Sequence, residues 1–160
     1  MSQELPDIDE VLKEALKHGI GGIHPGEDQL KALVESNPDG PLHFVNLLSF
    51  HPEARYPADH EFAERRMTGE EAYNGHYGPV AFRHVTQRGG RLTVLATVEQ
   101  AIIGRDAHWH QVATMEYPNV AAFLDMGADP DFQAATVHRN AGLADTLVLV
   151  TRSLLPPTAP

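Results

Sequence analysis

The stretch that most constrains the fold runs from His108 to Arg139, where an alternating segment passes directly into a helical one. Residues 108–117 read HWHQVATMEY, and side chains of unlike polarity alternate along them with the period of two that is typical of a strand. A Pro-Asn turn then leads into residues 120–139, a helical segment that an Asp-Pro pair restarts near its middle. One face of the strand carries two imidazoles, a hydroxyl and a carboxylate, so this strand is a candidate wall of a binding site.

Three more segments have strand patterns, at residues 42–50, 91–103 and 145–152. A helix is predicted over residues 68–87, because Thr68 and Glu71 form a capping box and apolar residues recur at helical spacing. Pro79 lies inside this helix and removes a hydrogen bond to the residue four positions back, which is Gly75. We therefore expect a kink there.

The remaining segments are less regular. Residues 51–67 are polar and interrupted by Pro, which predicts a long loop; such a loop is either a functional lid or a plain surface insertion. Within residues 1–40, one helix is predicted after Asp7 and another over residues 27–35, both packing over an edge or one end of the main fold. The tail, residues 154–160, is Pro-rich and predicted to be disordered.

The order of these elements is β-α-β followed by β-α-β, which predicts an α+β ferredoxin-like sandwich with a four-stranded antiparallel sheet. Residues 41–153 would form this domain, with residues 1–40 as an N-terminal helical extension. Right-handed crossovers put both helices on the same face of the sheet, which leaves the apolar opposite face uncovered. We infer a homodimer in which two such open faces pack together.

Composition excludes several functions. The chain has 160 residues, a hydrophobic content of 42% and a charged content of 21%, as expected of one soluble globular domain. No run approaches the roughly 18 apolar residues that span a bilayer, and the acidic N-terminal segment differs from a signal peptide, so a cytoplasmic location is expected. A formal charge of -10 disfavours nucleic acids and anionic membranes as partners. The lack of cysteine excludes thiolate chemistry.

A set of short motifs resembles a known family. The motifs are NLLSF at residues 46–50, Tyr73 with Tyr77, Gly89-Gly90, Ile103-Gly104, Trp109, Tyr117-Pro118, Phe123, Asp129-Pro130 and His138-Arg139. In this order and spacing they resemble the bacterial family labelled domain of unknown function 1330, in the dimeric α+β barrel superfamily, from about residue 24 to residue 151. The resemblance implies a barrel-forming dimer but no reaction, since the superfamily includes cofactor-free monooxygenases, haem proteins, polyketide cyclases and isomerases.

In that scaffold a pocket commonly lies between the sheet and its helices. We predict catalytic roles for His84 and His110, which can move a proton. We predict substrate-binding roles for a second group, comprising Asn46, Tyr73, Tyr77, Trp109 and Arg139. If Asn46, the two tyrosines and Arg139 converge on a pocket above about 300 Å³, a ligand site is the default interpretation.

Each candidate also has a plainer interpretation. Asn46 can bond to neighbouring backbone, the tyrosines can be core residues, and His84 can be a buried structural residue. Arg139 can form a salt bridge with an acidic residue in place of a substrate carboxylate, and Trp109 can serve packing alone. His108 and His110 share a strand face, but no metal-binding motif accompanies them, so we predict no metal and no resident cofactor.

The sequence therefore predicts a small-molecule-binding protein or cofactor-independent enzyme. Its ligand would be a carbonyl or aromatic compound, and its reaction would be enolisation, cyclisation or oxygenation. A non-catalytic ligand-binding or dimerisation module is the alternative, and haem binding through His84 or His110 is another. Whether the protein is an enzyme stays open at this point.

Overall fold

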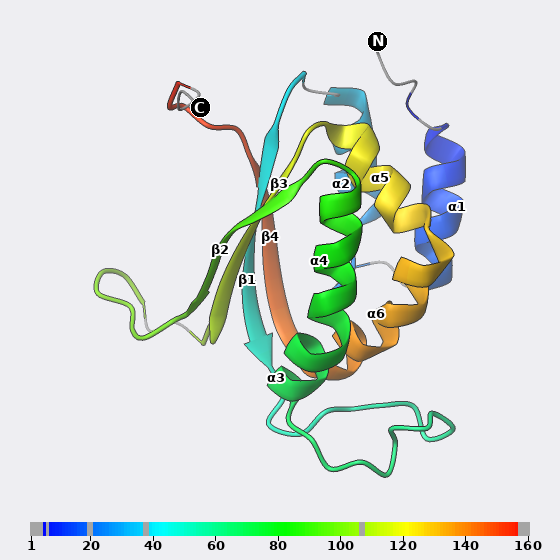
Figure 1. Cartoon of the computed structure of the whole chain (residues 1–160), viewed down its shortest axis with the longest axis vertical. Coiled ribbons are helices and arrows are strands. Elements are labelled where there is room, and N and C mark those ends of the chain that lie inside the picture. The colour runs from blue at the N-terminus through cyan, green and yellow to red at the C-terminus, as the bar shows by residue number, and fades with distance from the viewer. Residues whose placement is uncertain (1–4, 6, 19–20, 37–38, 106–107, 157–160) are drawn as a thin grey trace.

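The structure is a computed structural model that describes residues 5, 7–18, 21–36, 39–105 and 108–156, without the side chains of residues 16 and 18. A four-stranded antiparallel sheet in the order β2-β3-β1-β4 has helices on one side only (Figure 1). The strands are β1 (Leu42–Phe50), β2 (Arg91–Thr97), β3 (Gln111–Tyr117) and β4 (Leu143–Thr151). The helices are α1 (Ile8–His18), α2 (Glu27–Ser36), α3 (Gly69–Ala72), η1 (Tyr73–Tyr77), α4 (Gly78–Gln87), α5 (Val120–Ala128) and α6 (Pro130–Gly142). The predicted α+β ferredoxin-like fold is confirmed.

The core lies between the sheet and the helices. Alternate residues of the central strand β1, Leu42, Phe44 and Leu48, point to the helix side and are almost completely buried. The ring of Phe44 lies 4.5 Å from that of Phe123 and 4.9 Å from that of Tyr117. Alternation in β1 and β3 thus fixes which face of the sheet the helices cover.

The helical segment after residue 67 begins as predicted. The hydroxyl of Thr68 accepts from the backbone N–H of Glu71, and the backbone N–H of Thr68 donates to the Glu71 carboxylate, which confirms the capping box. At the expected kink the chain forms the π-helical turn η1, where the N–H of Gly78 donates to Tyr73 five residues back. Pro79, which cannot donate to Gly75, is the second residue of α4, directly after this turn.

The strands differ from the prediction at their ends and at one bulge. β2 ends at Thr97 instead of near Ile103, and the side chains of Ile102 and Ile103 are 87% and 92% exposed. A register shift between Leu92 and Val94 places them on opposite faces, although their alternation had predicted one face. β3 begins at Gln111, although the backbone of the preceding His110 still donates to the carbonyl of Leu48 and accepts from the N–H of Val98.

The N-terminal helices pack on the helix side of the fold. The Asp7 carboxylate accepts from the N–H of Asp9, consistent with the predicted cap. The guanidinium of Arg139 donates to the carbonyl of Ile23 at 2.7 Å, which ties α6 to the segment between α1 and α2. The predicted helix stop at residues 19–20, part of the turn at residues 37–38 and most of the tail, residues 157–160, lie outside the described residues.

No helix in the described segments combines the length and the apolar character needed to cross a membrane. The division into an extension and a domain, and the cytoplasmic location, stay predictions.

Three segments that are remote in sequence meet at a backbone junction just after the end of β1. The junction is formed by His51, Gly69 and Gly142. The N–H of His51 donates to the carbonyl of Gly142, and the N–H of Gly69 donates to the carbonyl of His51, both at 2.9 Å. A Cβ atom on Gly69 would lie 2.4 Å from the Gly142 carbonyl oxygen, and one on Gly142 would lie 2.5 Å from that of Gly69. Only glycine at both positions permits this approach.

We expect Gly142→Ala to lower the free energy of unfolding by about 1–3 kcal/mol, because the new methyl group overlaps a backbone carbonyl that cannot move freely. Gly127→Ala is the matched control: it also lies in a helix, has open space around its Cβ position, and should be neutral or stabilising. Urea denaturation of both variants measures the difference. Equal stability of the two variants would contradict the proposed tight junction.

Candidate ligand site

The predicted tyrosines and Arg139 lie together between η1 and α6. The rings of Tyr73 and Tyr77 are 4.9 Å apart, and both side chains are buried. Burial raises the pKa of both phenols, and the nearby charge of Arg139 opposes this increase. This group therefore fills the space between helices and sheet with packed rings.

Asn46 faces the same side of the sheet, but its amide is bound by the sheet itself. Its Nδ2 donates to the carbonyls of Phe44 at 2.9 Å and Ala113 at 3.1 Å. In a similar way, the amides of Asn74 and Gln111 form two reciprocal hydrogen bonds, of 2.8 and 3.1 Å, between η1 and β3. Sequence reasoning did not single out this second pair, although a π-helical turn is a frequent functional feature.

His84 is 3% exposed and lies in a charged network between α4 and α6. Its Nε2 lies 2.7 Å from the Asp131 carboxylate, and its Nδ1 lies 2.9 Å from a guanidinium nitrogen of Arg88. The hydrogen bond with His84 lowers the pKa of Asp131, and the one from Arg88 lowers the pKa of Asp129. Because both imidazole nitrogens are occupied, His84 does not fit as a haem ligand.

His110 and Trp109 lie at the start of β3. The Nδ1 of His110 accepts from the N–H of Phe50 at 2.9 Å, and its ring stacks on the Phe50 ring. Trp109 packs on His108, whose Nε2 lies 2.7 Å from the Asp145 carboxylate. The catalytic roles of His84 and His110, and the binding roles of the other five residues, stay predictions.

His84→Leu should lower the free energy of unfolding by about 1–3 kcal/mol, because it removes two hydrogen bonds and leaves the guanidinium of Arg88 without one of its partners. His108→Ala removes an exposed histidine–carboxylate pair and should change stability by less than about 0.5 kcal/mol. Thermal unfolding of the two variants compares them. If the His84→Leu protein is as stable as the His108→Ala protein, the interpretation of His84 as a structural residue is contradicted.

A cluster of aromatic and histidine rings lies where the loop of residues 51–67 meets the body of the protein. The cluster consists of Tyr56, His60, Phe62, His76 and His138. Tyr56 Oη lies 2.8 Å from His138 Nδ1, and Phe62 is the buried residue among them. Burial lowers the pKa of His138, and the charges of His76 and His60 lower it further. Nothing in the local pattern of the loop predicts this cluster, because its partners come from η1 and α6.

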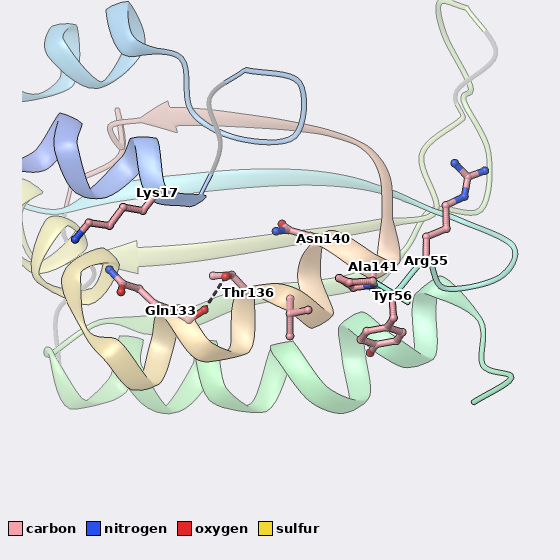
Figure 2. A pocket seen from close by; sticks show the side chains of 9 residues that line it. Lys17, Arg55, Tyr56, Gln133, Thr136, Asn140 and Ala141 are labelled. Atoms are coloured by element: carbon pink, nitrogen blue, oxygen red, sulfur yellow. Dashed lines mark hydrogen bonds between the residues drawn. The ribbon is translucent and has the colours of Figure 1, made fainter. Parts of the chain in front are cut away.

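Next to the cluster lies a cleft of about 480 Å³ between α1, the loop and the outer side of α6 (Figure 2). Its lining consists of Lys17, Arg55, Tyr56, Pro57, Gln133, Thr136, Val137, Asn140 and Ala141. None of the seven residues predicted from the sequence is among them. The predicted set therefore does not line this cleft.

The cleft combines cations with an unsatisfied acceptor. Arg55 is exposed, and no carboxylate in the described part of the chain forms a salt bridge with it, whereas the ammonium of Lys17 pairs with Glu14. Asn140 Oδ1 is buried and has no hydrogen-bond partner among the described residues, and Figure 2 shows its amide pointing toward the Lys17 side of the cleft. A buried acceptor left unbonded costs free energy, and because this Oδ1 is itself closed to solvent, a donor on a ligand can reach it only if the amide rotates toward the cleft.

Within the described ranges, no group of three or more His, Cys, Asp or Glu side chains has the arrangement of a metal site. The histidine cluster is included in this statement, since Phe62 lies among its rings.

Comparisons with known proteins identify relatives but no activity. The model of a family described as domain of unknown function, DUF1330, matches residues 62–153. The crystal structure of methylated RPA0582 protein is 33% identical with a TM-score of 0.76, covering 86% of this chain and 98% of that chain. The RPA0582 protein of unknown function from Rhodopseudomonas palustris gives 33% identity and a TM-score of 0.75 over 85% of this chain and 99% of that chain. No curated protein matches the chain.

Proposed function

The chain belongs to the family described as domain of unknown function 1330, and we propose that it is a small-molecule-binding protein whose ligand is a compact carboxylate that also carries a hydrogen-bond donor. The observation that carries this proposal is the buried, unbonded Oδ1 of Asn140 in the wall of a 480 Å³ cleft. Small-molecule sites have volumes of roughly 300–1,000 Å³, and the volume of this cleft lies in that range.

Each part of the ligand has a counterpart in the cleft. Arg55 supplies a guanidinium, the group best suited to bind a carboxylate through two hydrogen bonds. Lys17 adds a second cation, reduced in effect by its pairing with Glu14. Asn140 Oδ1, once its amide rotates toward the cleft, accepts from a hydroxyl or amino group, and Tyr56 with Val137 packs on the apolar part.

The lining favours binding over catalysis. It contains no imidazole and no carboxylate, so it lacks a side chain that could act as a general base near neutral pH. The two histidines predicted as catalytic, His84 and His110, are engaged with Asp131 and with the backbone of Phe50. Enolisation, cyclisation or oxygenation in this cleft would therefore need a base supplied by the ligand or by solvent.

Mandelate, phenylacetate and mandelamide test the ligand class, since phenylacetate lacks the hydroxyl donor and mandelamide lacks the charge. We expect mandelate to bind about tenfold more tightly than either relative, which is roughly 1.4 kcal/mol for each lost interaction. Arg55→Ala should weaken mandelate binding by a similar factor, whereas Arg152→Ala, an exposed arginine on the C-terminal segment, should not. Isothermal titration calorimetry measures all of these affinities.

Native mass spectrometry of the protein from its own host provides a second measurement, because it weighs any retained small molecule. A protein that carries no molecule and binds none of the three probes contradicts the binding function. Equal binding of mandelate and phenylacetate contradicts only the proposed role of Asn140.

We also infer a homodimer through the open face of the sheet. The apolar side chains on that face are Val45, Leu47, Val94, Ala96, Val112, Leu147 and Leu149. Val94, Leu147 and Leu149 are among the exposed large apolar residues, which would lose contact with water if two sheets packed together. The resemblance to dimeric α+β barrels supports the same arrangement.

Light scattering should give twice the chain mass of 17.5 kDa. Leu149→Asp places a charge on the apolar face of the edge strand β4 and should produce monomers, because an unpaired charge in a dimer interface is costly. Phe82→Asp, on the exposed side of α4, is the control that should leave the dimer intact. A monomeric wild-type protein at micromolar concentration would exclude the inferred dimer.

A further inference from the structure

The loop of residues 51–67 is attached to the body of the protein by two kinds of contact. At its ends the attachment is backbone hydrogen bonding: Ala54 N–H donates to the Met67 carbonyl at 2.9 Å, and Arg55 N–H donates to the Ala141 carbonyl at 2.8 Å. In its middle the attachment is the ring cluster, with Phe62 inserted among the histidines. The ring of Phe62 lies 4.8 Å from His76 and 5.2 Å from His138.

Three imidazoles surround this inserted phenylalanine, and each comes from a different element. His60 belongs to the loop, His76 to η1 and His138 to α6. The ring of His138 lies 5.1 Å from His76 and 5.8 Å from His60, and its Nδ1 bonds with Tyr56 of the loop. Histidine is the side chain whose charge ordinarily changes between pH 5 and 8, so one protonation step can act on all three contacts.

We propose that this ring cluster is an acid-sensitive latch that holds the loop of residues 51–67 closed over one end of the cleft at neutral pH and releases it on acidification. The latch itself is inferred from the ring cluster and does not depend on any ligand. Its consequence for ligand binding rests on the function proposed above.

The electrostatics of the cluster favour the neutral form. The groups that face His138 are Tyr56, His60 and Glu61 from the loop and His76 from η1. Only the Glu61 carboxylate favours the charged imidazole, whereas burial and the two other histidines lower the pKa of His138. Arg65 adds a further positive charge, since its guanidinium carbon lies 3.9 Å above the Phe62 ring. Protonation of two rings would place like charges within about 6 Å of each other in a partly dry site.

The sign of the pH effect follows from this lowered pKa. The closed state binds fewer protons than the open state, in which His138 has a pKa near its usual 6.5. The stabilisation of the closed state is therefore fully present above about pH 6.5 and is lost as the pH falls through the lower pKa of the closed state.

The loop opens more easily than the rest of the chain because few of its side chains are buried. Phe62 is the one loop side chain in the buried class, and most others are exposed. The hydrophobic core between the sheet and the helices contains no residue of the loop. Local opening then needs only the loss of the ring cluster and a few backbone bonds. It also removes Arg55 and Tyr56 from the lining of the cleft.

Hydrogen exchange followed by mass spectrometry, corrected for the intrinsic effect of pH on exchange, tests the latch in the full chain without any ligand. Between pH 7.5 and 5.5 we expect protection of the loop amides to fall severalfold, because the open state takes up a proton that the closed state disfavours, while β1 keeps its protection. The variant His138→Phe keeps an aromatic ring in the cluster but removes the imidazole whose pKa is lowered, and should lose most of this response. The control His43→Phe with His108→Phe changes histidines outside the cluster and should respond as the wild type does.

A wild-type loop that stays equally protected at pH 5.5 overturns the proposal, and so does an unchanged response in the cluster variant. If that variant does not fold, the NMR titration of the wild-type His138 ring replaces it: a midpoint at or above 6.5 contradicts the latch. Mandelate affinity is measured separately at both pH values. A loop that opens without any loss of affinity contradicts the proposed cleft and leaves the latch in place.

Discussion

The architecture depends on the junction at which His51, Gly69 and Gly142 touch through their backbones. Two hydrogen bonds of 2.9 Å close it, and the missing side chains of both glycines allow the contact. The junction joins the end of β1, the start of α3 and the end of α6, which are remote in sequence. It therefore fixes both ends of the 51–67 loop against the same helix terminus.

The functional geometry follows from that attachment. With its ends fixed, the loop places the backbone of Arg55 against Ala141 and the hydroxyl of Tyr56 against His138. Phe62 then fills the space between η1 and α6, where the π-helical turn presents His76. The ring cluster and the adjoining end of the cleft are thus two results of one closed loop.

Sequence reasoning succeeded where the signal is local. Alternation in residues 42–50, the Thr68 capping box and the Asp129-Pro130 helix start predict elements that the structure contains, and their order predicts the fold. The loop cluster could not be predicted in this way, because Phe62, His76 and His138 meet only through tertiary contacts. The bulge near Thr93 likewise has no local signal, and it changes the face on which Val94 lies.

The position of the cleft follows from the two sides of α6. Phe132 and Ala135 are buried on its inner side, where the ring of Tyr77 packs 5.9 Å from that of Phe132. Large aromatic rings therefore pack in this part of the space between the helices and the sheet. The outer side carries Gln133, Thr136 and Asn140, which α1 and the loop enclose (Figure 2). In this chain, therefore, the N-terminal helix and the long loop border a surface cleft outside the core between the helices and the sheet, and Asn140, with its buried unbonded acceptor, is among the residues that line it.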